Sequence, residues 1–380
     1  MIPTMATLPE RVGQIFWIGF EGNAWNRQLE ELLGEVRPGG VIFFPRNMAS
    51  RPEFAELVRQ IAAVLSRPPA QTPLLAIDLE GGKVDRFREA LAPLPSARAA
   101  ARAGLARELG RVAGREVASF PLNVDFAPVL DLGLPESESV LGSRTAGASP
   151  EQVARFGEEF LTGLAESGTL GCGKHFPGLG SGCLDSHLAM PRIEKDAALL
   201  WEQDLFPYRA LASRLPMVMV AHAAYPALDP GFSDANPRQL LPASLSRNIV
   251  SGLLKGRIGY EGLVLCDDLE MEGVLEDRSI GEAGVAAVRA GCDMLLVCQH
   301  AANVRAAFEA VLREAERDSD FRAMVEEAAQ KVIRARQRLP SAQPVSSADS
   351  DWESLRREIH ALAADVQQRL AGIVEKGRDA

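Results

Sequence analysis

Eight short, continuously apolar segments recur along the chain, and they constrain its fold more than any other feature. The first four are VGQIFWIGF, GGVIFF, PLLAIDLE and LNVDFAPVLDL, and the remaining four are GTLGCGKHF, PMVMVAHAAY, GLVLCDDLE and CDMLLVCQ. Continuous apolar character is typical of strands that are covered on both faces. Amphipathic segments such as RPEFAELVRQIAAVLS lie between them and provide that cover. This alternation predicts an α/β fold.

The number of apolar segments favours a (β/α)₈ TIM barrel. A chain of 380 residues is long enough for this fold, which commonly takes about 250 residues as one domain. A doubly wound open sheet is the alternative that the same alternation allows. We expect residues 1–340 to form a single TIM-barrel catalytic domain.

The composition changes after residue 340. Residues 341–351 are rich in Pro, Ser and Ala, which is typical of a linker. In residues 352–380, apolar residues recur at steps of three and four, which predicts an amphipathic helical tail; they are Leu355, Ile359, Leu362, Val366, Leu370 and Ile373. The sequence leaves open whether this helix docks on the barrel or on a second subunit, and it leaves the oligomeric state open.

The charge and hydropathy patterns argue against two classes of partner. The chain has 41 basic and 51 acidic residues and a net charge of -10, which argues against binding to nucleic acid. No apolar run approaches the ~20 residues that a membrane span requires. The opening residues MIPTMATLPERVGQIF do not resemble a secretion signal, and the odd number of cysteines, five, suits reduced thiols. We therefore expect a cytoplasmic protein without a membrane partner.

Polar residues gather at the ends of the apolar segments. The carboxyl ends of barrel strands converge on one mouth, where active sites are built. The residues expected there are Asp78, Glu80, Asp125, Asp131, Lys174, His175, His222, Asp267 and Asp268.

The stretch GCGKHFPGLGSGCLDSHLAMP combines several chemically active side chains. Cys172, His175, Cys183 and His187 could be counted as a zinc quartet, but the stretch lacks the paired CxxC or HxxxH spacing of such sites. A phosphate loop is a weaker alternative, because Lys174 precedes the glycines instead of following them. We expect neither a metal nor a cofactor.

Two carboxylate-containing motifs point to acid/base chemistry. Asp185 precedes His187 by two residues, so it can orient the imidazole as a proton donor and acceptor; the pair is equally compatible with a stabilised turn. Asp267 and Asp268 leave one strand together and cannot both ionise comfortably without partners. We expect Asp267 to face the mouth and Asp268 to support the loop or cap a helix. A carboxylate nucleophile with a histidine acid/base satisfies glycosyl transfer with retention.

Six motifs occur in the order AIDLEGGKVDRF, LGSRTAG, GKHFPGLGSGCLDSH, MVAHAAYPALD, PASLS and LCDDLEMEG. Together they resemble the signatures of glycoside hydrolase family 3, and most closely those of its single-domain bacterial β-N-acetylglucosaminidases, which recycle cell-wall fragments. The resemblance covers about residues 10 to 335. It implies a retaining exo-β-N-acetylglucosaminidase that removes terminal β-linked GlcNAc from cytoplasmic muropeptides.

The resemblance also implies roles for individual residues. Asp267 corresponds to the nucleophile that forms a covalent glycosyl-enzyme, and His187, oriented by Asp185, corresponds to the acid/base. The sugar-binding positions correspond to Asp78, Arg86, Arg144, Lys174 and His175. Charged groups suit this task because their hydrogen bonds to hydroxyls are stronger than neutral ones.

The chain departs from the family pattern without losing any of these groups. Where the family commonly has His, Gln, Arg, Phe and Ser, this sequence has Leu179, Leu79, Lys83, Ala146 and Cys266. Two other functions remain as alternatives: a β-N-acetylglucosaminide or β-glucoside phosphorylase on the same barrel, and a sugar-binding protein without catalysis.

Overall fold

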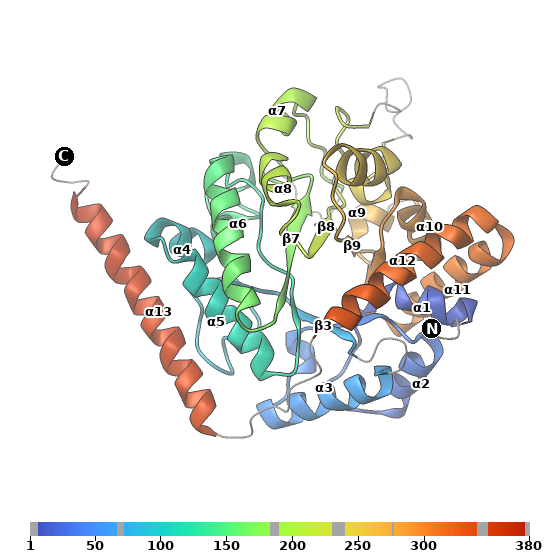
Figure 1. Ribbon diagram of the computed structural model, residues 1–380, viewed down its shortest axis with the longest axis horizontal. Helices are drawn as coiled ribbons and strands as arrows, with labels where there is room; N and C mark the ends of the chain where they lie inside the picture. The colour runs from blue at the N-terminus through green and yellow to red at the C-terminus, as the bar shows by residue number, and fades with distance from the viewer. Residues whose placement is uncertain are drawn as a thin grey trace.

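The computed structural model describes residues 7–66, 72–182, 190–229, 240–275, 277–339 and 349–376. These residues include a closed barrel of parallel strands in the order β1-β10-β9-β8-β7-β6-β3-β2 (Figure 1). The strands are β1 (Phe16–Ile18), β2 (Gly40–Phe43), β3 (Leu74–Ile77), β6 (Val124–Asp125), β7 (Leu170–Phe176), β8 (Met217–Val220), β9 (Leu263–Asp268) and β10 (Met294–Val297). Each lies in one of the eight apolar segments. The predicted TIM barrel is confirmed, and the open sheet is wrong.

The barrel closes between strands from opposite ends of the chain. β1 pairs in parallel with β2 on one side and with β10 on the other. In this register Trp17 lies beside both Gly40 and Leu296. A short antiparallel hairpin, β4 (Leu79–Gly81) with β5 (Val84–Asp85), leaves the barrel directly after β3.

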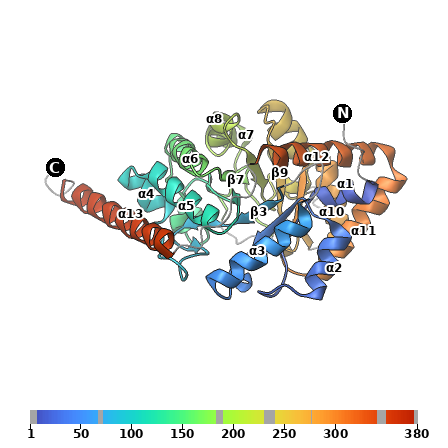
Figure 2. The same cartoon turned by 60° about the horizontal axis from the view of Figure 1, so that its bottom comes forward.

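Helices surround the barrel, as two views show (Figures 1 and 2). The segment RPEFAELVRQIAAVLS forms α3, and its buried residues Phe54, Leu57, Val58, Ile61 and Leu65 recur at helical spacing. The helices are α1 (Leu8–Gln14), α2 (Arg27–Val36), α3 (Arg51–Leu65), α4 (Ala97–Ala103), α5 (Ala106–Ser119), α6 (Pro150–Ala165), α7 (Ala197–Glu202), α8 (Phe206–Leu211), α9 (Glu272–Leu275), α10 (Ile280–Ala290), α11 (Ala301–Arg317), α12 (Ser319–Arg338) and α13 (Asp349–Lys376). Single 3₁₀ turns are η1 (Pro45–Asn47), η2 (Pro135–Ser137), η3 (Gly142–Arg144) and η5 (Ala243–Leu245), and η6 (Asn248–Arg257) is π-helical.

Local signals fix both ends of α10. Ser279 and Glu282 form a capping box at the start of α10, which satisfies two backbone donors that a helix start leaves unpaired. Gly291 ends the same helix with φ +110°, a conformation that costs glycine little. These three residues therefore set the length of the helix that precedes β10.

The interior of the barrel is packed with side chains. Trp17 and Phe126 meet there edge to face, with their ring centroids 4.9 Å apart, and Met217, Leu265 and Leu296 belong to the same buried cluster. A second, larger apolar cluster fills the space between barrel and helices. Because the barrel is filled, a ligand has room only at its ends.

The predicted tail helix is present as α13. It lies beside α4 and α5 in both views (Figures 1 and 2), and its residues Leu355, Ile359, Leu362 and Val366 are buried. It therefore docks on the barrel's own helices. The division into residues 1–340, 341–351 and 352–380 stays a prediction.

Two further observations concern the described part of the chain. Its helices include none with the length and apolar character to cross a membrane. Cys172, Cys266, Cys292 and Cys298 are buried free thiols, as expected, whereas Cys183 lies outside the described residues.

Candidate active site

A cavity of about 260 Å³ opens at the carboxyl ends of the barrel strands. Six predicted site residues line it together: Asp78, Arg86, Arg144, Lys174, His175 and Asp267. The other two, Asp185 and His187, fall in residues 183–189, outside the described residues. The cavity is smaller than the roughly 300–1,000 Å³ of drug-sized ligand sites, so it suits a single sugar ring.

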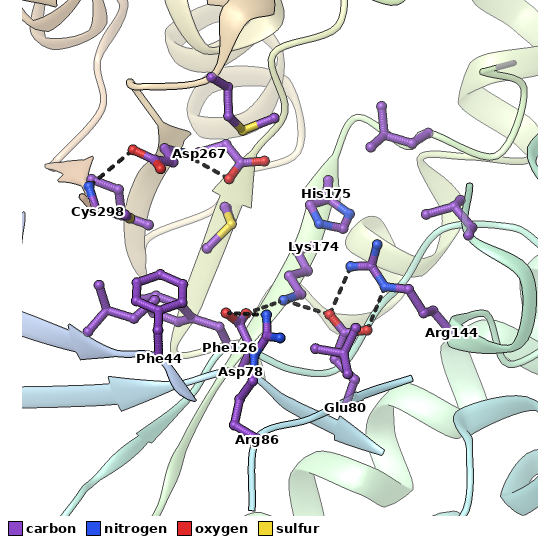
Figure 3. A pocket seen from close by; sticks show the side chains of 18 of the residues that line it. Phe44, Asp78, Glu80, Arg86, Phe126, Arg144, Lys174, His175, Asp267 and Cys298 are labelled. Atoms are coloured by element: carbon purple, nitrogen blue, oxygen red, sulfur yellow. Dashed lines mark hydrogen bonds and ion pairs between the residues drawn. The ribbon is translucent and has the colours of Figure 1, made fainter. Parts of the chain in front are cut away.

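One side of the cavity carries a dense network of charges (Figure 3). Lys174, in β7, places its Nζ 2.6 Å from Oδ1 of Asp78 and 2.7 Å from Oε1 of Glu80. Arg144, at the end of η3, donates from Nε and Nη2 to the two oxygens of Glu80 over 2.7 and 2.9 Å. Such a bidentate pair fixes both the position and the orientation of the guanidinium.

The network keeps its members charged despite their burial. Burial alone raises the pKa of Glu80. Lys174 and Arg144 lower the pKa by more than burial raises it, so the net pKa lies well below the ordinary value. Burial alone lowers the pKa of Lys174, but Asp78 and Glu80 raise it well above its ordinary value. The site therefore presents fixed charges at neutral pH.

Arg86 is held less tightly than Arg144. Its Nη2 lies 3.9 Å from Oδ2 of Asp78, which is too long for a hydrogen bond. Its Nε is buried, and no described residue accepts a hydrogen bond from it. Arg86 thus retains unused donor capacity beside the cavity.

His175 is oriented by a carboxylate behind it. Its Nδ1 lies 2.7 Å from Oδ2 of Asp131, whose other oxygen accepts from the backbone N–H of Leu179 over 2.8 Å. Asp131 is fully buried. This arrangement leaves Nε2 of His175 as the ring nitrogen available to a ligand.

Asp267 and Asp268 end β9 and have different surroundings. Burial raises the pKa of Asp267, but His175, His222 and the backbone N–H of Asp268 lower it, and the net pKa lies below its ordinary value. Burial raises the pKa of Asp268 to about 7, and the nearby charges of Glu270 and Asp267 also raise it. The pair is thus split into an ionised carboxylate and a group that is partly protonated near neutrality.

The two carboxyl groups also differ in their contacts. Oδ1 of Asp267 accepts from the neighbouring backbone N–H over 2.8 Å, and the carboxylate faces the cavity opposite Lys174 (Figure 3). Oδ1 of Asp268 accepts from the N–H groups of Glu270 and Cys298 over 3.0 and 3.2 Å. Asp268 therefore ties the loop after β9 to the end of β10 instead of capping α9.

His222 supports the end of β9 from behind. It is fully buried, with Nδ1 2.7 Å from Oγ of Ser244 and Nε2 3.0 Å from the carbonyl oxygen of Asp268. Burial lowers its pKa, so the ring favours the neutral form and donates from one nitrogen. Its contacts hold the backbone that carries Asp267.

The sequence does not identify Glu80 and Asp131 as site residues, although both organise the site. Their only signal is their position as polar groups at the ends of apolar segments, which places them at the barrel mouth. Their partners, Arg144 and His175, lie 64 and 44 positions further along the chain. Neither pairing can be read from local spacing.

Metal binding has no support within the described ranges. No three His, Cys, Asp or Glu side chains there come together in a way that could hold an ion. Cys172 is buried in the apolar interior of the barrel, whereas His175 lines the cavity.

Comparisons with known proteins agree on one family. Residues 7–335 match the glycosyl hydrolase family 3 N terminal domain. A protein named beta-hexosaminidase from Alkalilimnicola ehrlichii is 39% identical over 74% of this chain and 80% of its own length, and one of the same name from Idiomarina loihiensis is 33% identical over 90% and 98%. A solved glycoside hydrolase family 3 beta-N-acetylglucosaminidase from Paenibacillus sp. is 32% identical, with a TM-score of 0.82 over 93% of this chain and 68% of its own.

Proposed function

Since this chain belongs to glycosyl hydrolase family 3 and is therefore a glycosidase, we propose that it is a retaining exo-β-N-acetylglucosaminidase. Its substrate is a carbohydrate with a terminal β-linked GlcNAc. The observation that carries the proposal is the position of Asp267, an ionised carboxylate that faces a small, charge-lined cavity. Its relatives named beta-hexosaminidase support the class of sugar.

The proposed reaction has two steps. An oxygen of Asp267 attacks the anomeric carbon while the glycosidic bond breaks, and His187 gives its proton to the departing oxygen. His187 then removes a proton from water, which attacks the same carbon and releases Asp267. Asp185 orients the imidazole.

Sugar hydroxyls bind to the charged side of the cavity in this proposal. Arg86, Arg144 and Lys174 donate hydrogen bonds, and Asp78 accepts them. Nε2 of His175 faces the same ring. The small volume of the cavity, about 260 Å³, favours removal of one terminal residue over cleavage within a longer chain.

The physiological substrate that we propose is a muropeptide from cell-wall recycling in the cytoplasm. This part rests on the motifs that the sequence shares with the cell-wall-recycling branch of the family. It is tested by incubating the protein with purified GlcNAc-anhydro-muropeptides and identifying free GlcNAc.

The sugar specificity is tested with aryl glycosides. Turnover of aryl β-GlcNAc should exceed that of the aryl β-glucoside by at least tenfold in kcat/KM. A preference for the glucoside would overturn the specificity. Added phosphate should leave free GlcNAc as the product, and a sugar 1-phosphate would instead identify a phosphorylase. Binding of GlcNAc without any turnover would identify a sugar-binding protein.

The covalent step is tested by trapping. A fluorinated N-acetylated glycosyl donor should label the protein, and mass spectrometry should locate the adduct on Asp267. The D268N variant is the matched control and should still be labelled. An adduct on any other residue would contradict the assignment of the nucleophile.

A further inference from the structure

Helix α13 lies outside the part of the chain that matches the family, residues 7–335. It is nevertheless anchored by buried side chains, among them Trp352 and Leu355. Charged contacts add to the anchoring, because Glu358 of α13 pairs with Arg111 and Arg115 of α5. An appended helix that docks this extensively can transmit its position to what lies beneath it.

A chain of aromatic rings connects α13 with the cavity. Trp352 packs edge to face on Phe120, with the ring centroids 5.1 Å apart. Phe120 stacks on Phe87, with the centroids 4.2 Å apart and the planes 16° from parallel. Phe87 directly follows Arg86, which lines the cavity. One continuous set of ring contacts therefore leads from α13 to the residue next to the arginine.

The same segment is held by polar contacts from two sides. Arg356 of α13 donates to the carbonyl oxygens of Leu91 and Ala90 over 3.2 and 3.3 Å. From within, the buried carboxylate of Asp85 accepts from the N–H groups of Phe87 and Leu94 over 3.1 and 2.8 Å. The backbone around Arg86 is thus fixed between the barrel and α13.

Arg86 depends on this backbone more than Arg144 does. Arg144 is locked by two hydrogen bonds to Glu80, whereas the nearest carboxylate oxygen to Arg86 is 3.9 Å away. A guanidinium without a bidentate partner takes its position from its own main chain and from the residues that pack against it. A shift of the segment would therefore move Arg86 but leave Arg144 in place.

We propose that α13 is a positioning element for the active site, in which Trp352 acts through Phe120 and Phe87 to place Arg86 against the substrate. This inference rests on the proposed role of Arg86 in sugar binding. It gives the C-terminal helix a part in substrate affinity as well as in stability.

The test compares two truncations of buried residues on α13. W352A removes the first ring of the chain, and I359A removes a buried side chain two helical turns further along. Both should lower the melting temperature. W352A should also raise KM for aryl β-GlcNAc and the inhibition constant of free GlcNAc by about three- to tenfold, with kcat within twofold, because it weakens binding of the substrate and of the transition state equally. I359A should leave both constants unchanged.

A double-mutant cycle with R86A separates positioning from general loosening. R86A alone should raise KM, and W352A should add little to KM once Arg86 is absent, because the two residues act as one unit. If W352A does not fold, R356A should raise KM in the same direction by a smaller factor, because it removes the hydrogen bonds to Ala90 and Leu91 together with an exposed pair to Glu353 on the same helix.

The two proposals fail in different ways. If R86A raises KM while folded W352A and R356A do not, the positioning role of α13 is wrong and the sugar-binding role of Arg86 stands. An undiminished effect of W352A in the R86A background also overturns the positioning role. If R86A itself leaves KM unchanged, Arg86 does not bind the sugar, and the inference falls with that assignment.

Discussion

The two sides of the cavity hold their charged side chains in different ways. On the side of β3 and β7, the carboxylates of Asp78 and Glu80 and the cations of Lys174 and Arg144 neutralise one another through short contacts. On the side of β9, Asp267 keeps its charge although no cationic side chain among the described residues is in direct contact with it. Within that part of the chain, its carboxylate accepts a hydrogen bond only from a backbone N–H. A tightly paired network suits binding, because its geometry is fixed before the ligand arrives. A carboxylate free of ion pairs suits attack on carbon, because its electrons are not shared with a neighbour.

The largest effect should come from neutralising Asp267, the carboxylate on the side of β9. D267N keeps the shape of the side chain but removes the anion, so kcat should fall by a factor on the order of 10³ or more. Steady-state turnover of aryl β-GlcNAc measures the loss. D268N should keep most of the activity, since its amide oxygen can still accept from Glu270 and Cys298. Retention of more than a tenth of kcat in D267N would mean that the nucleophile lies elsewhere.

The next largest effect should come from the paired side. E80Q removes the carboxylate that both Lys174 and Arg144 contact. Breaking a buried ion pair lowers the free energy of unfolding by about 3–5 kcal/mol. The free energy of unfolding from urea titration measures this cost. E166Q is the matched control, because its pair with Arg107 is exposed and should contribute less than about 1 kcal/mol. Equal losses in the two variants would show that the network does not stabilise the fold.

The smallest effect, taken per pH unit, concerns the pH dependence of stability. Asp268 holds its proton up to about pH 7 in the folded protein, whereas the ordinary pKa of an aspartate is 3.8. Between these values the unfolded chain binds fewer protons, so this group makes stability fall as pH rises, by at most about 1.4 kcal/mol per pH unit. D268N removes the titration. Its stability relative to the native protein should therefore rise from about pH 4 to pH 7 and then level off. A constant difference over that range would contradict the raised pKa.

The sequence predicts the barrel because continuous apolar runs that are too short to span a membrane have few other uses. It also predicts most of the cavity, since the carboxyl ends of parallel strands must meet. The hairpin β4–β5 is not predictable in this way, because its strands are two or three residues long and lie inside a polar motif.

Pairings between distant residues are the other part that the sequence leaves open. His175 and Asp131 leave different barrel strands, and their contact depends on the stagger between those strands. The opposite pKa shifts of Asp267 and Asp268 depend on burial and on two histidines that lie far away along the chain. The sequence of α13 predicts a helix with an apolar face but does not identify the surface on which that face packs.

The pairing of β1 with β10 has a consequence for synthesis on the ribosome. Phe16 emerges early, but its neighbour Leu295 follows nearly three hundred residues later. Until then β1 presents an unpaired edge, which is open to wrong partners, and the barrel cannot close. A nascent chain that stalls before β10 would therefore be an open sheet with two unpaired edge strands, and it should be a preferred client for chaperones.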